Sequence, residues 1–106
     1  MKILLDECVT KKLKPYLDKH DVYTVSQMKW NGFRNGNLIQ RSIDEGFNMI
    51  LTIDKNIAHQ QNILNKNIII NIWNSKSSKI EDIIKFIPEF EKKYAGYNNG
   101  NIYLLD

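Results

Sequence analysis

The sequence predicts an α/β fold, in which a mainly parallel sheet of four or five strands lies between two layers of helices. Short runs of apolar and β-branched residues alternate along the chain with stretches whose apolar residues recur at helical spacing. Strands in such a chain are expected to run parallel, because each intervening helix returns the chain to the same end of the sheet. With 106 residues, the chain fits one domain over residues 1–106 and is short for two.

The first half of the chain is expected to supply three strands and two helices. Strand segments are recognised by β-branched and aromatic runs, helices by apolar residues three or four positions apart, and the long loop by two Asn-Gly pairs. The expected elements are a strand over 2–5, a helix with Val9, Leu13, Tyr16 and Leu17 on one face, a strand over 22–25, a loop over 26–37, a helix with Leu38 and Ile43 that ends at Gly46, and a strand over 49–53.

The second half is expected to add two strands and two helices. Its most regular feature is a β-branched run over 67–73, which is typical of a strand covered on both faces. Ser78 and Glu81 have the spacing of a capping box, and Pro88 falls inside the helix that they would start. The remaining expected elements are a short helix from 57 to about 64, a polar loop over 74–79, a long helix over 80–94 and an edge strand over 102–105.

Composition excludes several classes of protein. Apolar residues make up 42% of the chain and charged residues 25%, which is typical of a folded globular protein rather than a disordered one. No apolar run approaches the ~20 residues that span a bilayer, and we see no signal-peptide pattern, so we expect a cytoplasmic protein without a membrane partner. The single cysteine, Cys8, argues against a disulfide scaffold or a zinc knuckle.

Carboxylates follow two of the expected strands directly. Asp6 and Glu7 come after the first strand, and Asp54 comes after the third. In a parallel α/β sheet, ligands bind beyond the carboxyl ends of the strands, and neighbouring strands lie about 4.8 Å apart. If the first and third strands are neighbours, Asp6 and Asp54 therefore share one small space. Their repulsion is relieved by a shared proton or by a bound divalent cation.

Mg²⁺ or Mn²⁺ suits an oxygen site of this kind, with Asp6 and Asp54 as direct ligands. Such an ion lowers the pKa of bound water and neutralises charge on a phosphodiester, so the pair predicts phosphodiester hydrolysis, with Glu7 as a base if a turn directs it back. A second interpretation is structural. Aspartate at a strand-to-helix junction is a favoured N-cap, and either residue could simply accept hydrogen bonds from helix amides.

The net charge of +3 gives a mild preference for polyanionic partners. Aromatic and basic residues alternate in the loop over 27–34, as in surfaces that stack unpaired bases and contact phosphates. A loop fixed to the core by its aromatic side chains is an equally ordinary interpretation. The candidate RNA contacts are Lys29, Trp30, Arg34, Arg41 and Lys55.

Two segments carry a family resemblance. The opening Met-Lys-Ile-Leu-Leu-Asp-Glu-Cys-Val and the later Asn-Met-Ile-Leu-Thr-Ile-Asp-Lys-Asn-Ile, about fifty residues on, resemble the small bacterial PIN-like proteins, relatives of the VapC-type toxin ribonucleases. The resemblance implies a metal-dependent endoribonuclease that acts on RNA such as transfer RNA. It also implies the toxin half of a toxin–antitoxin pair, whose antitoxin protein blocks the site. A homodimer is compatible with the sequence as well.

Two positions depart from the pattern that the resemblance implies. Relatives place an acid near 35–37 and another two residues after the second aspartate, where this chain has Asn37 and Asn56. Asparagine can ligate a metal through its carbonyl oxygen but adds no charge. The alternative function is therefore a weakened or inactive PIN-like module that binds RNA or a partner protein. A receiver-like signalling domain ranks well behind, because the first strand lacks the neighbouring acidic cluster.

Overall fold

The computed structural model describes residues 1–57 and 62–106 and contains one five-stranded parallel sheet. Its strands lie in the order β2-β1-β3-β4-β5, and every neighbouring pair runs parallel. The prediction of an α/β fold around a parallel sheet is therefore confirmed. The strand bounds are β1 Lys2–Leu5, β2 Asp21–Thr24, β3 Met49–Thr52, β4 Ile69–Trp73 and β5 Asn101–Leu105.

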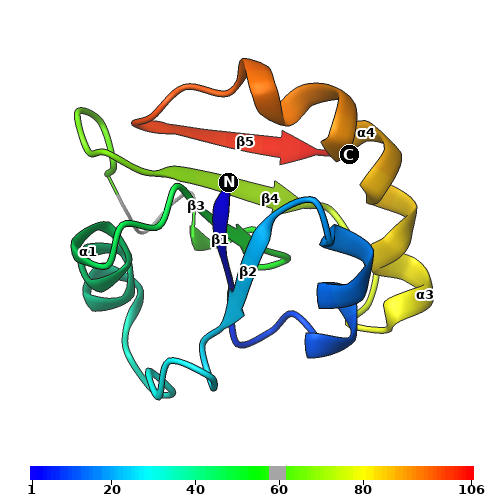
Figure 1. Ribbon diagram of the computed structural model, residues 1–106, viewed down its shortest axis with the longest axis horizontal. Coiled ribbons are helices and arrows are strands. Elements are labelled where there is room, and N and C mark those ends of the chain that lie inside the picture. Colours follow the sequence, from blue (N-terminus) through cyan, green and yellow to red (C-terminus); the bar gives the residue numbers. More distant parts are fainter. Residues whose placement is uncertain (58–61) are drawn as a thin grey trace.

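Helical segments cover both faces of this sheet. Figure 1 shows α1 on one side of the sheet and η1, α3 and α4 on the other. The described helical segments are η1 Lys11–Leu17, α1 Asn35–Asp44, α3 Ile80–Ile83, η2 Ile84–Phe86, α4 Ile87–Lys93 and η3 Tyr94–Gly96. None of the helices in the described ranges is long and apolar enough to cross a membrane.

Two apolar clusters form the core, one on each face of the sheet. Alternation along β1 assigns Ile3 and Leu5 to the cluster under η1 and α4, whereas Leu4 belongs to the cluster under α1. All three side chains are fully buried. Because both faces of the central strands are covered, β3 and β4 consist of buried residues from end to end, as their sequence pattern predicts.

The helix after β1 differs from the prediction. Residues 11–17 form a 3-10 helix that contains Pro15, and Thr10 caps it by accepting a hydrogen bond from Lys12 N–H. Leu13 and Leu17 are buried as expected, but Tyr16 is 52% exposed.

The long helix expected over 80–94 is confirmed in position but is not one regular α-helix. The segment instead consists of α3, η2, α4 and η3, and Pro88 lies in the first turn of α4, where its missing N–H costs no helix hydrogen bond. The predicted Ser78–Glu81 capping box is also absent. The N-cap residue Lys79 has no side-chain cap, and the Ser77 hydroxyl instead accepts from Lys79 N–H and donates to Asp82.

Helix α1 begins at Asn35 and so takes up the end of the expected loop over 26–37. Gly46 follows this helix with a φ of 82°, which confirms the predicted glycine end. Strand β1 spans 2–5 as predicted, and the other strand bounds differ by one or two residues, as in β2, which spans 21–24 rather than 22–25. Of the helix expected from 57 to about 64, residues 58–61 lie outside the described residues, and residues 62–64 are not helical.

Candidate functional site

The two strand-end aspartates lie where the order of the strands reverses. β1 and β3 are direct neighbours, with Leu5 paired to Leu51, and β2 lies on the other side of β1. Asp6 continues this pairing, because its N–H donates to Leu51 O at 3.0 Å. In doubly wound sheets the crevice at such a reversal is the usual ligand site. A site shared by Asp6 and Asp54 requires β1 and β3 to be neighbours, and the structure confirms that they are.

A buried threonine connects the two aspartates. The Thr52 hydroxyl donates to Asp6 Oδ2 at 2.8 Å and accepts from the backbone N–H of Asp54 at 3.0 Å. Thr52 is fully buried at the end of β3, so this contact is shielded from water. The hydroxyl therefore fixes the Asp6 carboxylate relative to the turn that carries Asp54.

Both aspartates also accept local backbone hydrogen bonds. Asp6 Oδ1 accepts from Glu7 N–H at 2.8 Å, and Asp54 Oδ1 accepts from Asn56 N–H at 2.9 Å. These are the contacts that the structural interpretation of the aspartates expects. A carboxylate oxygen can accept more than one hydrogen bond, so each group keeps capacity for a ligand.

Asp6, Glu7 and Asp54 line one pocket of about 270 Å³, here called the carboxylate pocket. Glu7 is held there by the loop before α1, since the backbone N–H of Gly32 donates to Glu7 Oε1 at 2.6 Å. Gly32 has a φ of 83°, a left-handed conformation that glycine adopts without strain. The pocket is completed by Cys8, Val25, Trp30, Phe33, Asn35 and Leu38.

Among the described residues, no basic side chain forms an ion pair with the carboxylates of this pocket. The same part of the chain contains no group of three or more His, Cys, Asp or Glu side chains arranged to hold a metal ion. The carboxylate pocket is thus negatively charged, and its three carboxylates are the candidate ligands for a metal ion.

Cys8 lies beside the aspartates but is not poised as a nucleophile. Its Sγ lies 3.4 Å from Thr52 Oγ1 and 3.7 Å from Asp6 Oδ2. Desolvation of the thiol raises the pKa of Cys8, and the negative charge of Asp6 raises it further, although the Thr52 hydroxyl acts in the opposite direction. The neutral thiol therefore dominates at neutral pH.

The asparagines occupy different positions around the site. Asn35, at the start of α1, lines the carboxylate pocket. Asn37 instead lines a neighbouring pocket together with Arg41. Asn56 contributes its backbone N–H to Asp54 and is exposed. The early start of α1 explains why Asn35 rather than Asn37 faces the carboxylates, because the two positions are 200° apart around a helix.

The candidate RNA contacts fall into two groups. The basic residues are all exposed, and they are Lys29, Arg34, Arg41 and Lys55. Trp30 is only 7% exposed and packs into the core under α1, whereas the neighbouring Phe33 is 37% exposed. The two rings stack with centroids 6.3 Å apart. Sequence reasoning singled out Trp30, but Phe33 is the aromatic surface that is open to solvent.

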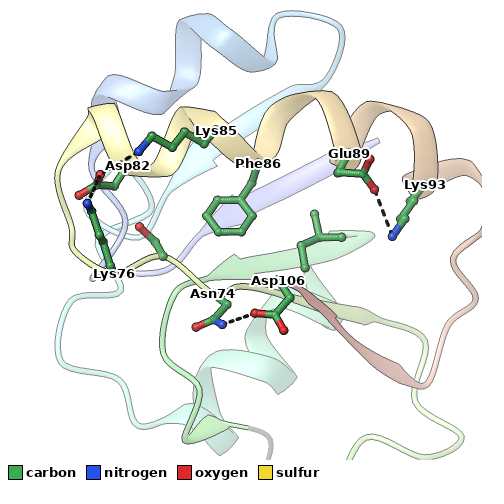
Figure 2. A pocket seen from close by; sticks show the side chains of 10 residues that line it. Asn74, Lys76, Asp82, Lys85, Phe86, Glu89, Lys93 and Asp106 are labelled. Atoms are coloured by element: carbon green, nitrogen blue, oxygen red, sulfur yellow. Dashed lines mark hydrogen bonds and ion pairs between the residues drawn. The ribbon is translucent and has the colours of Figure 1, made fainter.

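A larger pocket of about 410 Å³ lies at the carboxyl ends of β4 and β5. Figure 2 shows side chains of α3, η2 and α4 facing Asn74 and Asp106 across it, with Phe86 between them. Its lysines are paired with acids. Lys76 and Lys85 lie 3.8 and 3.6 Å from Asp82, and Lys93 lies 3.2 Å from Glu89. Since its charges compensate one another, this pocket attracts an ion less strongly than the carboxylate pocket does.

Comparison of this chain with family models, with curated proteins and with solved structures gave no match. The resemblance to PIN-like proteins therefore stays a prediction that rests on two short segments. The functional argument rests on the geometry of the carboxylate pocket, which is where the strand order and the acidic side chains coincide.

Proposed function

We propose that this protein is a metal-dependent endoribonuclease of the PIN-like type and the toxin component of a toxin–antitoxin pair. One observation carries the proposal: Asp6, Glu7 and Asp54 line one pocket at the reversal of strand order, without a basic partner in the described ranges. Carboxylates at such an edge suit phosphoryl chemistry, because they attract the cation that phosphate binding requires.

The donor set fits Mg²⁺ or Mn²⁺, which bind one or two carboxylates and keep several water ligands. Asp6 and Asp54 are the residues that would hold the ion, and Asn56 could add a carbonyl oxygen. When bound, the ion lowers the pKa of water and neutralises charge on the phosphodiester. No larger acidic cluster is needed for this mode of binding.

The chain's own residues have separate tasks in this proposal. Thr52 orients the Asp6 carboxylate through the 2.8 Å hydrogen bond of its hydroxyl group. Glu7, held by Gly32 N–H, takes the proton of the water that attacks phosphorus as the bond to the leaving ribose oxygen breaks. The exposed cations Lys29, Arg34, Arg41 and Lys55 are candidates to contact the phosphates of the bound RNA.

A second candidate is a module that binds RNA or a partner protein without cleaving it. It is favoured by the finding that no group of three or more ligating side chains occurs within the described ranges. It is also favoured by Asn37 and Asn56, which add no charge where the resemblance implies acids. In this case the same exposed surface binds RNA, and the carboxylates serve only to fix the turns.

The two candidates differ in one assay. Total transfer RNA is incubated with Mn²⁺ and the wild-type protein, or with the Asp6→Asn or Asp54→Asn variant. The endoribonuclease proposal predicts fragments with the wild type, none with a chelator, and at least about a hundredfold slower cleavage by either variant. No cleavage by the wild type under Mn²⁺ or Mg²⁺ favours the binding module. Cleavage that neither substitution slows contradicts the proposed centre.

A matched control separates chemistry from folding. Asp18→Asn makes the same change of charge and size at the end of η1, at an exposed position outside the carboxylate pocket. Far-ultraviolet circular dichroism and urea unfolding of all three variants establish that they are folded under assay conditions. Cleavage by the Asp18→Asn protein, with loss in the other two, assigns the defect to the pocket.

A further inference from the structure

Phe33 connects the carboxylate pocket to a second pocket on α1. Its side chain lines the pocket that contains Asp6 and Asp54, and it also lines a neighbouring pocket of about 300 Å³. The ring is 37% exposed, so a bound molecule can contact it. A chain of RNA that crosses the carboxylates can therefore extend over Phe33 into the second pocket.

The polar lining of the second pocket comes from one face of α1. Its residues are Asn37, Gln40, Arg41 and Asp44, whose spacing of three, four and seven is that of a single helical stripe. The described residues of this stripe are all exposed. An exposed stripe with two amides, a guanidinium and a carboxylate offers both donors and acceptors to a ligand.

Contacts within the pocket hold two of these groups in position. The Arg41 guanidinium lies over the Phe33 ring, 5.8 Å from its centroid. Gln40 donates from Nε2 to Asp44 Oδ1 at 3.0 Å. The exposed part of the Phe33 ring therefore lies beside a cation and a carboxylate that are both directed by neighbours.

This combination matches one nucleobase better than the others. An aromatic ring stacks on any base, since every base has a π face. Arginine is the usual donor to O6 and N7 of guanine, and a carboxylate accepts from N–H groups of a base. Guanine alone among the four RNA bases offers both an acceptor pair for Arg41 and adjacent N–H donors for Asp44.

We propose that the second pocket is a nucleobase subsite that holds one unpaired guanine of the RNA whose phosphate lies at the carboxylates. The proposal rests on the proposed ribonuclease function for its RNA ligand, and it adds the residues that select the base. Phe33 supplies the stacking surface, and Arg41 and Asp44 distinguish guanine from the other bases. A pocket of about 300 Å³ lies at the small end of ligand sites and suits a single base.

The experiment measures binding, not cleavage. Fluorescence anisotropy compares a labelled heptauridine RNA with the same RNA carrying one central guanosine, both with Ca²⁺ in place of Mg²⁺ or Mn²⁺, so that the carboxylates are neutralised without the metal of the cleavage assay. The wild-type protein is expected to bind the guanosine RNA about tenfold more tightly. Asp44→Asn is expected to abolish this preference, and Phe33→Leu to weaken binding of both RNAs about tenfold.

Glu45→Gln is the matched control, since it removes an equal charge one residue further on, outside the pocket. It is expected to retain the full guanosine preference. Equal binding of the two RNAs by the wild type, or binding of neither RNA, overturns the proposal. A guanosine preference that persists in Asp44→Asn also overturns it, and so does a preference that Glu45→Gln loses as well. Failure of the ribonuclease proposal shows instead as absent cleavage in Mn²⁺, which this binding assay does not measure.

Discussion

The Thr52 hydroxyl donates a 2.8 Å hydrogen bond to Asp6 Oδ2 across the pair of strands that carries both aspartates. The same oxygen accepts from Asp54 N–H at 3.0 Å. One buried side chain thus fixes the Asp6 carboxylate and the Asp54 backbone, which lie 48 positions apart in the sequence. This contact makes the carboxylate pocket a fixed arrangement and leads to the first prediction.

Thr52→Val should damage both stability and activity. The substitution keeps the volume of the side chain but leaves the Asp54 N–H without its acceptor and Asp6 without its donor, which costs about 1–3 kcal/mol in the free energy of unfolding. We also expect about tenfold slower RNA cleavage, because the Asp6 carboxylate can rotate. Urea unfolding and initial cleavage rates provide the measurements.

Thr52→Ser is the control for this prediction, because it keeps the hydroxyl group. It should retain most of the activity and lose stability only through the missing methyl group. A Thr52→Val protein as stable and active as the wild type would show that the hydroxyl bridge has no energetic role.

Glu7 should determine the order of the loop before α1. Gly32 N–H donates to Glu7 Oε1 at 2.6 Å, and a hydrogen bond to a charged acceptor is stronger than a neutral one. Glu7→Ala should therefore speed hydrogen exchange of the Gly32 amide by about tenfold or more. Glu7→Gln keeps an oxygen acceptor and should show a smaller change. Identical exchange in all three proteins would contradict this role for Glu7.

The stability of the protein should fall in acid partly through Asp82. The hydrogen bond from the Ser77 hydroxyl lowers the pKa of Asp82, and Lys76 and Lys85 lower it further. The folded state therefore favours the ionised carboxylate. This contribution to stability is complete above the pKa of Asp82 in the unfolded chain and is lost as the pH falls through its lower pKa in the folded protein.

The Ser77→Ala variant tests that contribution, since it removes the first of these causes. Its urea midpoint should lie below that of the wild type at neutral pH, and the difference should shrink as the pH is lowered toward 2. A gap between the two proteins that stays constant over this range would show that Asp82 ionisation is not linked to folding through Ser77. Lys79→Ala, at an exposed neighbouring position, serves as the control.

His20 and Glu91 should stabilise the contact between the end of η1 and α4. The His20 side chain is 1% exposed, and its Nε2 lies 2.9 Å from Glu91 Oε1. Removing the carboxylate leaves a buried ring nitrogen without this partner, so Glu91→Ala should lower the free energy of unfolding by about 1–3 kcal/mol. Glu91→Gln keeps an oxygen at this position and should lose less. If Glu91→Ala and Glu91→Gln have the same free energy of unfolding, the hydrogen bond to His20 has no part in stability.

The sequence predicts the sheet and the position of the site because strand ends are marked by local signals. Asp6 and Asp54 follow apolar runs directly, and their proximity depends only on β1 and β3 being neighbours, which the structure confirms. The rest of the site could not be predicted in this way. Thr52 looks like an ordinary strand residue, and the contact between Glu7 and Gly32 depends on how a long loop folds back.

Helix details were predicted less well, for identifiable reasons. Pro15 and Pro88 change the winding of η1 and the start of α4, and a helical periodicity by itself does not reveal such changes. The exposure of Phe33 relative to Trp30 depends on packing against Phe47, which is distant in sequence. Helix α1 begins three residues earlier than expected, and Asn35 rather than Asn37 lines the carboxylate pocket.

The central claim is that the carboxylates of Asp6 and Asp54 are the catalytic groups of a ribonuclease. The most direct measurement is the single-turnover rate of cleavage of an end-labelled, single-stranded RNA with saturating Mn²⁺, for the wild type and for Asp6→Asn. We predict wild-type cleavage that a chelator abolishes and a rate at least about a hundredfold lower for the folded Asp6→Asn protein. Equal rates for the two proteins, or no wild-type cleavage at all, would contradict the claim.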